Sequence, residues 1–261
     1  MTSRDELLDY LCDQETHLVA LRATLGRWLE TSRRYAGFVA ANRDKIRKKI
    51  RLQSGPDALE DLRWELAVGY LLHLDKRFTL TYEPYTRGQP FGPDYTVAYT
   101  TSFTFDVEVT RVRRGATVKA SALGDDGEGD GTGDDDVQSS YHRRVIDAIL
   151  GKLTQLTPNT PNVLVVGTAD GTLDADGLAN GMKQVRRRIQ AGDLAILSRY
   201  GFQSPAHFSK HFGRLNTVIA RPTTDQVENA SATLFWSNGA ATSASAALPA
   251  RATTALRQCL G

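Results

Sequence analysis

Cysteine is scarce in this chain of 261 residues. Only Cys12 and Cys259 are present, at opposite ends of the sequence, and neither belongs to a CxxC or a Cys/His spacing. Disulfide frameworks and structural zinc sites need several such ligands at short, regular intervals. The sequence therefore supports neither, and a chain of this length predicts one sizeable core with attached helices.

Long apolar runs and nucleotide-binding motifs are also missing. No stretch approaches the roughly 18 apolar residues that span a bilayer, and the N-terminal sequence MTSRDELLDY is charged where a signal peptide would be apolar. We therefore expect a cytoplasmic protein with no membrane segment. The absence of GxGxxG, of GKS/T and of a nucleophile elbow leaves dehydrogenase and kinase activities without support.

Charge is unevenly distributed along the chain. Seven acids fall between 125 and 136, so the remainder of a chain whose formal charge is +2 carries +9. The stretch 120–138 has almost no apolar residues and many glycines, which predicts a flexible acidic loop. It also lacks the spacing and the final Glu of a calcium-binding EF-hand loop.

The basic residues of the remainder gather in clusters at 42–51, 111–114 and 183–188. Such clusters favour an anionic partner, and the partner we expect is nucleic acid, DNA first. The alternative explanation is the solvated face of ordinary helices. Oligomeric state is not decided by these patterns, and a homodimer is left open.

Hydrophobic periodicity predicts alternating helices and strands. Helical spacing covers 5–51, and a second helix begins with capping residues at 54 and carries the apolar stripe Leu59, Leu62, Leu66, Tyr70 and Leu74. Runs rich in β-branched and aromatic residues predict strands at 78–83, 93–99, 103–112, 162–167, 216–221 and 232–236, with further helices at 141–156 and at the C-terminus. The pattern predicts an α/β domain at 53–261, with a central mixed sheet flanked by helices, after an N-terminal helical extension at 1–52.

Acidic side chains follow the predicted second and third strands. Because side chains alternate along a strand, Asp106, Glu108 and Thr110 share one face of the third strand. If the second strand pairs with the third as a hairpin, Asp94 at its start can approach Glu108. Two carboxylates on adjacent strands predict a divalent-metal site, since magnesium needs only one or two protein carboxylates. Glu65 adds an acid on an otherwise apolar arc of the preceding helix, where an ion pair at the edge of the core is the alternative explanation.

The order of these residues resembles the PD-(D/E)xK nuclease superfamily. The helix with Glu65, the GPD at 92–94, the DVEVTRV at 106–112, and the helix and strand that follow cover about residues 55 to 170. The resemblance implies a restriction endonuclease-like α/β/α core and hydrolysis of nucleic-acid phosphodiester bonds with Mg²⁺ or Mn²⁺. It implies Asp94 and Glu108 as metal ligands, with Glu65 assisting from the helix.

The chain departs from the family pattern at Thr110, which stands where the family has a lysine that stabilises negative charge. Some members relocate that lysine, and Lys152 on the next predicted helix is our candidate, with Gln155 on the same helix face to orient water or substrate. The alternative for Lys152 is an amphipathic-helix lysine that extends to solvent. Arg111 and Arg113, on the opposite strand face, are weaker substitutes.

Two other hypotheses stay open. The chain is either an active nuclease or a catalytically inactive nuclease-fold module that binds nucleic acid or protein. GFQSPAHFSKHFGR at 201–214 resembles the second helix-turn-helix of AraC-type regulators, although a predicted strand follows it directly. His207 and His211 in this segment lack the Glu of HExxH and a third ligand, so we expect surface histidines and not a zinc site.

Overall fold

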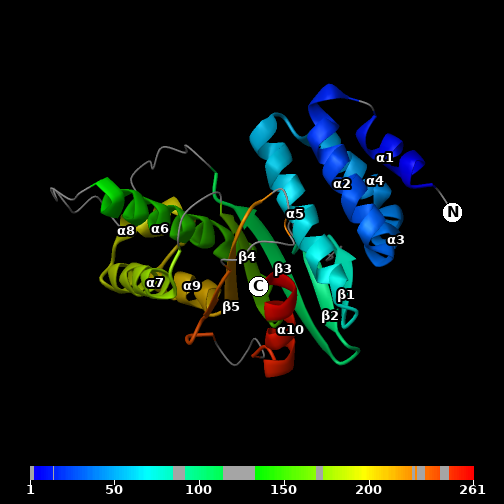
Figure 1. Cartoon of the computed structure of the whole chain (residues 1–261). Coiled ribbons are helices and arrows are strands. Elements are labelled where there is room, and N and C mark those ends of the chain that lie inside the picture. The colour runs from blue at the N-terminus through cyan, green and yellow to red at the C-terminus, as the bar shows by residue number, and fades with distance from the viewer. Residues whose placement is uncertain are drawn as a thin grey trace.

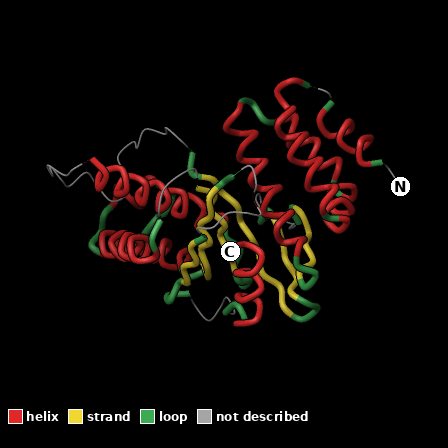
Figure 2. Tube along the Cα trace, in the orientation of Figure 1, coloured by secondary structure: helices red, strands yellow, loops and turns green. Residues whose placement is uncertain are grey.

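A six-stranded mixed sheet runs through the middle of the molecule, with helices on both of its faces (Figure 1). Figure 2 shows the strands between the two helical layers, so the predicted α/β class with a mixed sheet flanked by helices is confirmed. The computed structural model describes residues 3–13, 15–84, 92–113, 133–168, 173–224, 227, 233–241 and 247–261.

The strands follow one another across the sheet in sequence order. β1, β2 and β3 form an antiparallel meander, β3, β4 and β5 run parallel, and β6 is antiparallel to β5. All six lie where β-branched and aromatic residues predicted them, to within a few residues. Their bounds are β1 Phe78–Tyr82, β2 Tyr95–Tyr99, β3 Phe103–Arg111, β4 Asn162–Thr168, β5 Leu215–Pro222 and β6 Leu234–Ser237.

Each face of the sheet has its own hydrophobic core. On one face, Phe105 and Val107 of β3 belong to the core beneath α5 (Pro56–Leu74) and α10 (Ala250–Leu260). On the other face, Leu164 of β4 belongs to a second core, formed with the helices that connect the parallel strands. β4 is buried along its whole length because both of its faces are covered.

The helices on the second face come between the parallel strands. They are α6 (Gly133–Lys152), the 3-10 turn η2 (Leu153–Gln155), α7 (Ala175–Gln190), α8 (Leu194–Arg199) and α9 (Pro205–Phe212). Because α6 begins at Gly133, the predicted flexible loop is wrong for 133–138, and 120–132 lie outside the described residues.

Four helices from the N-terminal part of the chain form a further layer on the outside of α5 (Figure 1). Trp28 stacks on Tyr70 of α5 with ring centroids 5.2 Å apart, and the hydroxyl of Tyr35 donates to the backbone oxygen of Leu66 at 3.1 Å. The bounds are α1 Arg4–Cys12, η1 Thr16–Leu18, α2 Val19–Thr31, α3 Arg33–Ala41 and α4 Arg43–Leu52. Among the described residues, no helix combines the length and the apolar character that a membrane crossing requires.

α5 therefore lies between the sheet and the N-terminal layer. Its residues from Leu66 to His73 are buried on every side of the helix, so the predicted apolar stripe and the second apolar arc that carries Glu65 are both covered there. The stripe is wrong at Leu74, which is 48% exposed because it is the last residue of the helix. Glu65 directly precedes this buried stretch, and its side chain is only 13% exposed, which places its carboxyl group in a low-dielectric environment.

Candidate functional site

The β2–β3 hairpin brings Asp94 next to Glu108. Tyr95 pairs with Val107 in the antiparallel register, so the residues one step further along, Asp94 and Glu108, lie opposite each other. Oδ2 of Asp94 accepts the backbone N–H of Val109 at 2.8 Å. Gly92 lies two residues before Asp94, and a Cβ at that position would lie 2.9 Å from the carbonyl oxygen of Pro84. The glycine of the sequence GPD therefore fits the close approach of this segment to the chain that follows β1.

Burial and the charge of a neighbouring acid raise the pKa values of both carboxyl groups, and the neighbour is Glu108 for Asp94 and Glu65 for Glu108. Burial raises the pKa of Asp94 to about 7, the charge of Glu108 adds to this, and Lys49 and Lys152 oppose it. Burial also raises the pKa of Glu108, whose side chain is 7% exposed, against the opposing effects of Lys152 and of a backbone hydrogen bond from Asp94. Two neighbouring buried acids whose charged forms are disfavoured are suited to binding a cation.

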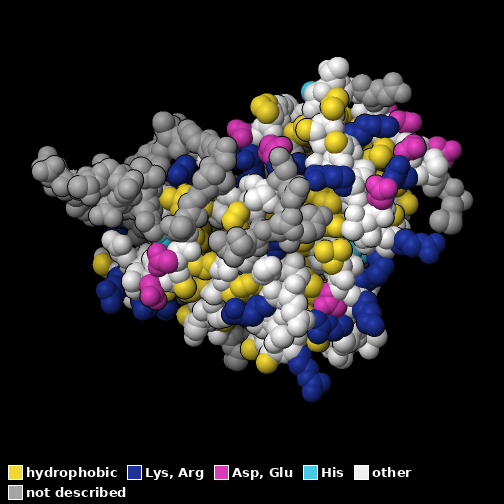
Figure 3. Space-filling view, in the orientation of Figure 1, with side chains coloured by type: hydrophobic (Ala, Val, Ile, Leu, Met, Phe, Trp, Pro, Cys, Tyr) yellow, Lys and Arg dark blue, Asp and Glu magenta, His cyan; other side chains and the backbone are white. Residues whose placement is uncertain are grey.

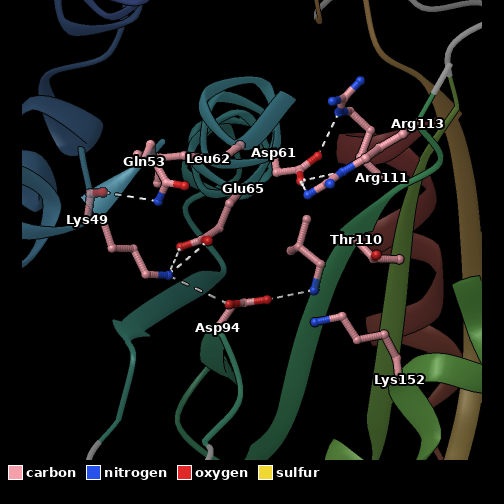
Figure 4. A pocket seen from close by; sticks show the side chains of 12 residues that line it. Lys49, Gln53, Asp61, Leu62, Glu65, Asp94, Thr110, Arg111, Arg113 and Lys152 are labelled. Atoms are coloured by element: carbon pink, nitrogen blue, oxygen red, sulfur yellow. Dashed lines mark hydrogen bonds and ion pairs between the residues drawn. The ribbon is translucent and has the colours of Figure 1, made fainter. Parts of the chain in front are cut away.

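Lys152 reaches this pair from the end of α6. Its Nζ lies 2.7 Å from Oε1 of Glu108 and 3.0 Å from Oε1 of Gln155. α6 ends at Lys152 and the chain continues into η2, which places Gln155 back beside the ammonium. The structure thus brings together Glu108, Lys152 and Gln155, while Thr110 and Lys152 line the same cavity (Figure 4).

Glu65 projects from α5 toward the same cavity, but its carboxylate already has partners (Figure 4). Lys49 of α4 donates to both of its oxygens, at 2.7 and 2.9 Å, and the hydroxyl of Tyr82 donates to Oε1 at 2.6 Å. Burial raises the pKa of Glu65 to about 7, and the charge of Asp94 contributes to the same effect. Asp94 is therefore close enough to Glu65 to raise its pKa, and the Glu65 carboxylate is held by Lys49.

The cavity has a volume of about 370 Å³ and lies between α5 and β3. Acids and cations are mixed along its wall, and the charged residues are Lys49, Asp61, Glu65, Asp94, Arg111, Arg113 and Lys152. Arg111 and Arg113 pair with Asp61 of α5, Arg111 through Nε at 2.9 Å. They lie at the end of the cavity away from Lys49, and they do not contact Glu108 as Lys152 does (Figure 4).

The donor set fits one small divalent cation. Asp94 and Glu108 supply the hard carboxylate oxygens that Mg²⁺ and Mn²⁺ prefer, and the rest of an octahedral shell comes from water and substrate. Among the residues that the structure describes, no three His, Cys, Asp or Glu side chains are grouped so that they could hold a metal ion together. Lys49 contacts Glu65 and Lys152 contacts Glu108, so an ammonium already lies beside each of these two carboxylates.

Comparison with known proteins assigns the chain to no family. No family model matches the chain, and no similar curated protein or solved structure was found. The site is therefore interpreted from its own residues.

Sequence reasoning did not find Lys49 and Glu83. Nζ of Lys49 also lies 2.7 Å from Oε1 of Glu83 and 3.9 Å from Oδ1 of Asp94. Lys49 belongs to the basic cluster at 42–51, where one lysine does not differ from its neighbours in the sequence. Its position next to buried Ile50 and three residues after buried Ile46 is the only local sign that it faces inward.

The segment that resembles a helix-turn-helix is part of the second core. Phe208 and Phe212 of α9 are buried, and α9 is followed within a few residues by β5. His207 and His211 are only partly exposed and face each other, with 3.0 Å between their Nε2 atoms. The backbone N–H of Gln203 donates to Nδ1 of His207, which assigns the remaining proton of that ring to Nε2 and makes Nε2 of His211 its acceptor. The pair satisfies itself without a metal ion.

Proposed function

We propose that the chain is a metal-dependent nuclease that hydrolyses phosphodiester bonds of DNA on a restriction endonuclease-like core. The observation that carries the proposal is the meeting of Glu108 with Asp94 and Lys152, which both line the cavity. Asp94 directly precedes β2, Glu108 lies in β3 and Lys152 ends α6, so the two acids follow the order of the PD-(D/E)xK pattern and the lysine is a relocated one. A chance match to short motifs would not be expected to bring the lysine to the acid.

Asp94 and Glu108 would hold the metal ion. When bound there, Mg²⁺ or Mn²⁺ would neutralise charge on a phosphodiester and make water acidic enough to act as a nucleophile. The backbone N–H of Val109 fixes one oxygen of Asp94 and leaves the carboxylate oriented toward the cavity. Glu65 supports the same region from α5 and keeps the local potential negative.

Lys152 would supply the positive charge that Thr110 cannot. An ammonium placed at the metal ligands stabilises the negative charge that develops on the phosphate or on the attacking oxygen. Gln155 accepts a hydrogen bond from Lys152, which fixes the ammonium near Glu108 and leaves the amide NH₂ of Gln155 to orient water or substrate. The cation thus comes from α6 instead of β3.

The cations that line the cavity are what favours nucleic acid as the proposed substrate. Arg111 and Arg113 line the end of the cavity beyond Thr110, where a neighbouring phosphate of the same strand would lie. On the face drawn in Figure 3, Lys and Arg side chains are spread over both helical layers and are mixed with acids. Local cations in the cavity, and not one broad basic surface, are therefore the basis for proposing a nucleic-acid substrate.

Incubation of the protein with end-labelled DNA and RNA, in Mg²⁺ or Mn²⁺, tests the proposal. The wild type is expected to cut DNA, and Asp94→Asn, Glu108→Gln and Lys152→Met are expected to lose most of the activity. Lys48→Met is the matched control, because Lys48 is exposed on α4 and lies outside the cavity. Cleavage by the three site variants at the wild-type rate would overturn the proposal.

A non-catalytic module that keeps this fold is the second candidate function. The observation that favours it is that the lysines already neutralise part of the carboxylate charge, while β3 offers Thr110 and no lysine. This candidate predicts that the wild type binds labelled nucleic acid but cleaves no more than Asp94→Asn does.

A further inference from the structure

The ammonium of Lys49, on the α4 side of the cavity, is surrounded by acids. Nζ of Lys49 contacts Glu65 at 2.7 Å and Glu83 at 2.7 Å, and it lies 3.9 Å from Asp94. An ammonium has three N–H donors and no acceptor, and here the acceptors are the two oxygens of Glu65 and one oxygen of Glu83, while Asp94 acts through its charge. The Lys49 nitrogen thus lies within 4.0 Å of oxygens of three carboxylates, those of Glu65, Glu83 and Asp94.

The position of this ammonium is fixed by its helix. Ile46 and Ile50 of α4 are buried, which sets the rotation of the helix against the rest of the fold. One turn before Lys49, Nζ of Lys45 donates to the backbone oxygens of Tyr82 and Glu83 at 2.9 and 3.0 Å. α4 is therefore attached to the end of β1 by two lysines, and Lys49 is held among the acids by the fold itself.

Arg111 and Arg113 are paired with Asp57 and Asp61, and the remaining acids and lysines of the cavity leave a net charge that one divalent ion neutralises. Glu65, Glu83, Asp94 and Glu108 provide four negative charges when ionised, and Lys49 and Lys152 provide two positive charges. The remaining two negative charges are neutralised by a single Mg²⁺ or Mn²⁺. Removal of Lys49 would leave one further negative charge and three acids around an empty position.

We propose that the ammonium of Lys49 takes the place of a second metal ion. The protein then binds one divalent cation, at Asp94 and Glu108, and the position beside Glu65 and Glu83 is filled by the side chain of Lys49. This inference rests on the proposed metal site of the nuclease function. It makes the N-terminal helical layer a part of that site, since α4 supplies the second cation.

The stoichiometry of Mn²⁺ binding tests the inference without an activity assay. Equilibrium dialysis of the full chain at pH 8 is expected to give one Mn²⁺ per wild-type chain, two per chain for Lys49→Met, and one for the control Lys48→Met. Two ions in the wild type, or one ion in Lys49→Met, would overturn the role of Lys49 and leave the proposed nuclease site in place. No bound ion in the wild type would overturn both.

A second measurement uses only the wild type, in case Lys49→Met does not fold. Amine acetylation followed by mass spectrometry compares Lys49 with exposed Lys48 in saturating Mn²⁺. Lys49 is expected to react at least about tenfold more slowly, because its hydrogen bonds to carboxylates must break before the amine can react. Reaction of Lys49 at the rate of Lys48 would mean that the metal displaces the ammonium, and the inference would be wrong.

Discussion

Nζ of Lys152 lies 2.7 Å from Oε1 of Glu108, although 44 positions separate the two residues in the sequence. The contact joins the end of α6 to the middle of β3 and places a cation beside an acid whose pKa is raised by burial. The positive charge that β3 lacks at Thr110 is therefore supplied to the cavity by α6.

Replacement of Lys152 is expected to affect turnover more than substrate binding. Lys152→Met should lower kcat by about 10²–10³, in the range found for removal of one group that stabilises transition-state charge, with little change in KM. Thr110→Lys in the Lys152→Met background should restore part of the loss, because Thr110 lines the same cavity. Steady-state kinetics on a labelled duplex measures both effects. A kcat for Lys152→Met within twofold of the control Lys183→Met would contradict the assigned role.

Metal binding should be visible as thermal stabilisation. Mg²⁺ or Mn²⁺ at about one hundred times its Kd is expected to add about 2.7 kcal/mol to the free energy of unfolding of the wild type. Asp94→Asn should lose most of this gain, since it removes a ligand and a charge. Thermal denaturation with and without the metal measures the difference. An equal rise of Tm in wild type and Asp94→Asn would place the metal elsewhere on the protein.

The aromatic contact between the N-terminal layer and α5 should contribute strongly to stability. Trp28 is 1% exposed and stacks on Tyr70, so Trp28→Ala is expected to lower the free energy of unfolding by about 3–5 kcal/mol. Val19→Ala is the control on the same helix, because Val19 is 62% exposed and should change stability little. Urea denaturation of the three proteins tests this, and a loss below about 1 kcal/mol for Trp28→Ala would show that the layer is weakly attached.

His73 should make the fold sensitive to mild acid. Its ring lies 4.6 Å from that of Phe38, and burial lowers its pKa below the ordinary value of 6.5. The unfolded chain then binds a proton more readily than the folded one, so this contribution to stability is complete above about pH 6.5 and is lost as the pH falls below it. Denaturation midpoints of wild type and His73→Phe between pH 7.5 and 5 measure the effect. Parallel pH profiles for the two proteins would exclude His73 as the cause.

The sequence predicted those features that depend on local patterns. Alternating apolar residues defined β3, and the hairpin placed Asp94 near Glu108 because antiparallel pairing follows from adjacent strands and a short turn. The approach of Lys152 was also predictable in part, since a helix after β3 must return across the sheet to reach β4. These steps need only near neighbours along the chain.

Lys49 and Glu83 could not be found in this way. Their contact requires α4 to pack against the end of β1, and that packing is decided by the whole N-terminal layer and not by any segment near β1. Periodicity gave a stripe and a second apolar arc on α5, but it did not show which layer would cover each of these faces.

Burial of α5 on two faces limits where the chain can be divided. One face of this helix covers the sheet and the other contacts Trp28 and Tyr35, so neither layer can melt without exposing apolar surface of the other. Unfolding should therefore occur as one cooperative transition across residues 4–113. A fragment that starts at 53 would expose the outer face of α5 to water and would tend to aggregate, so the N-terminal helices cannot be trimmed away as a removable attachment.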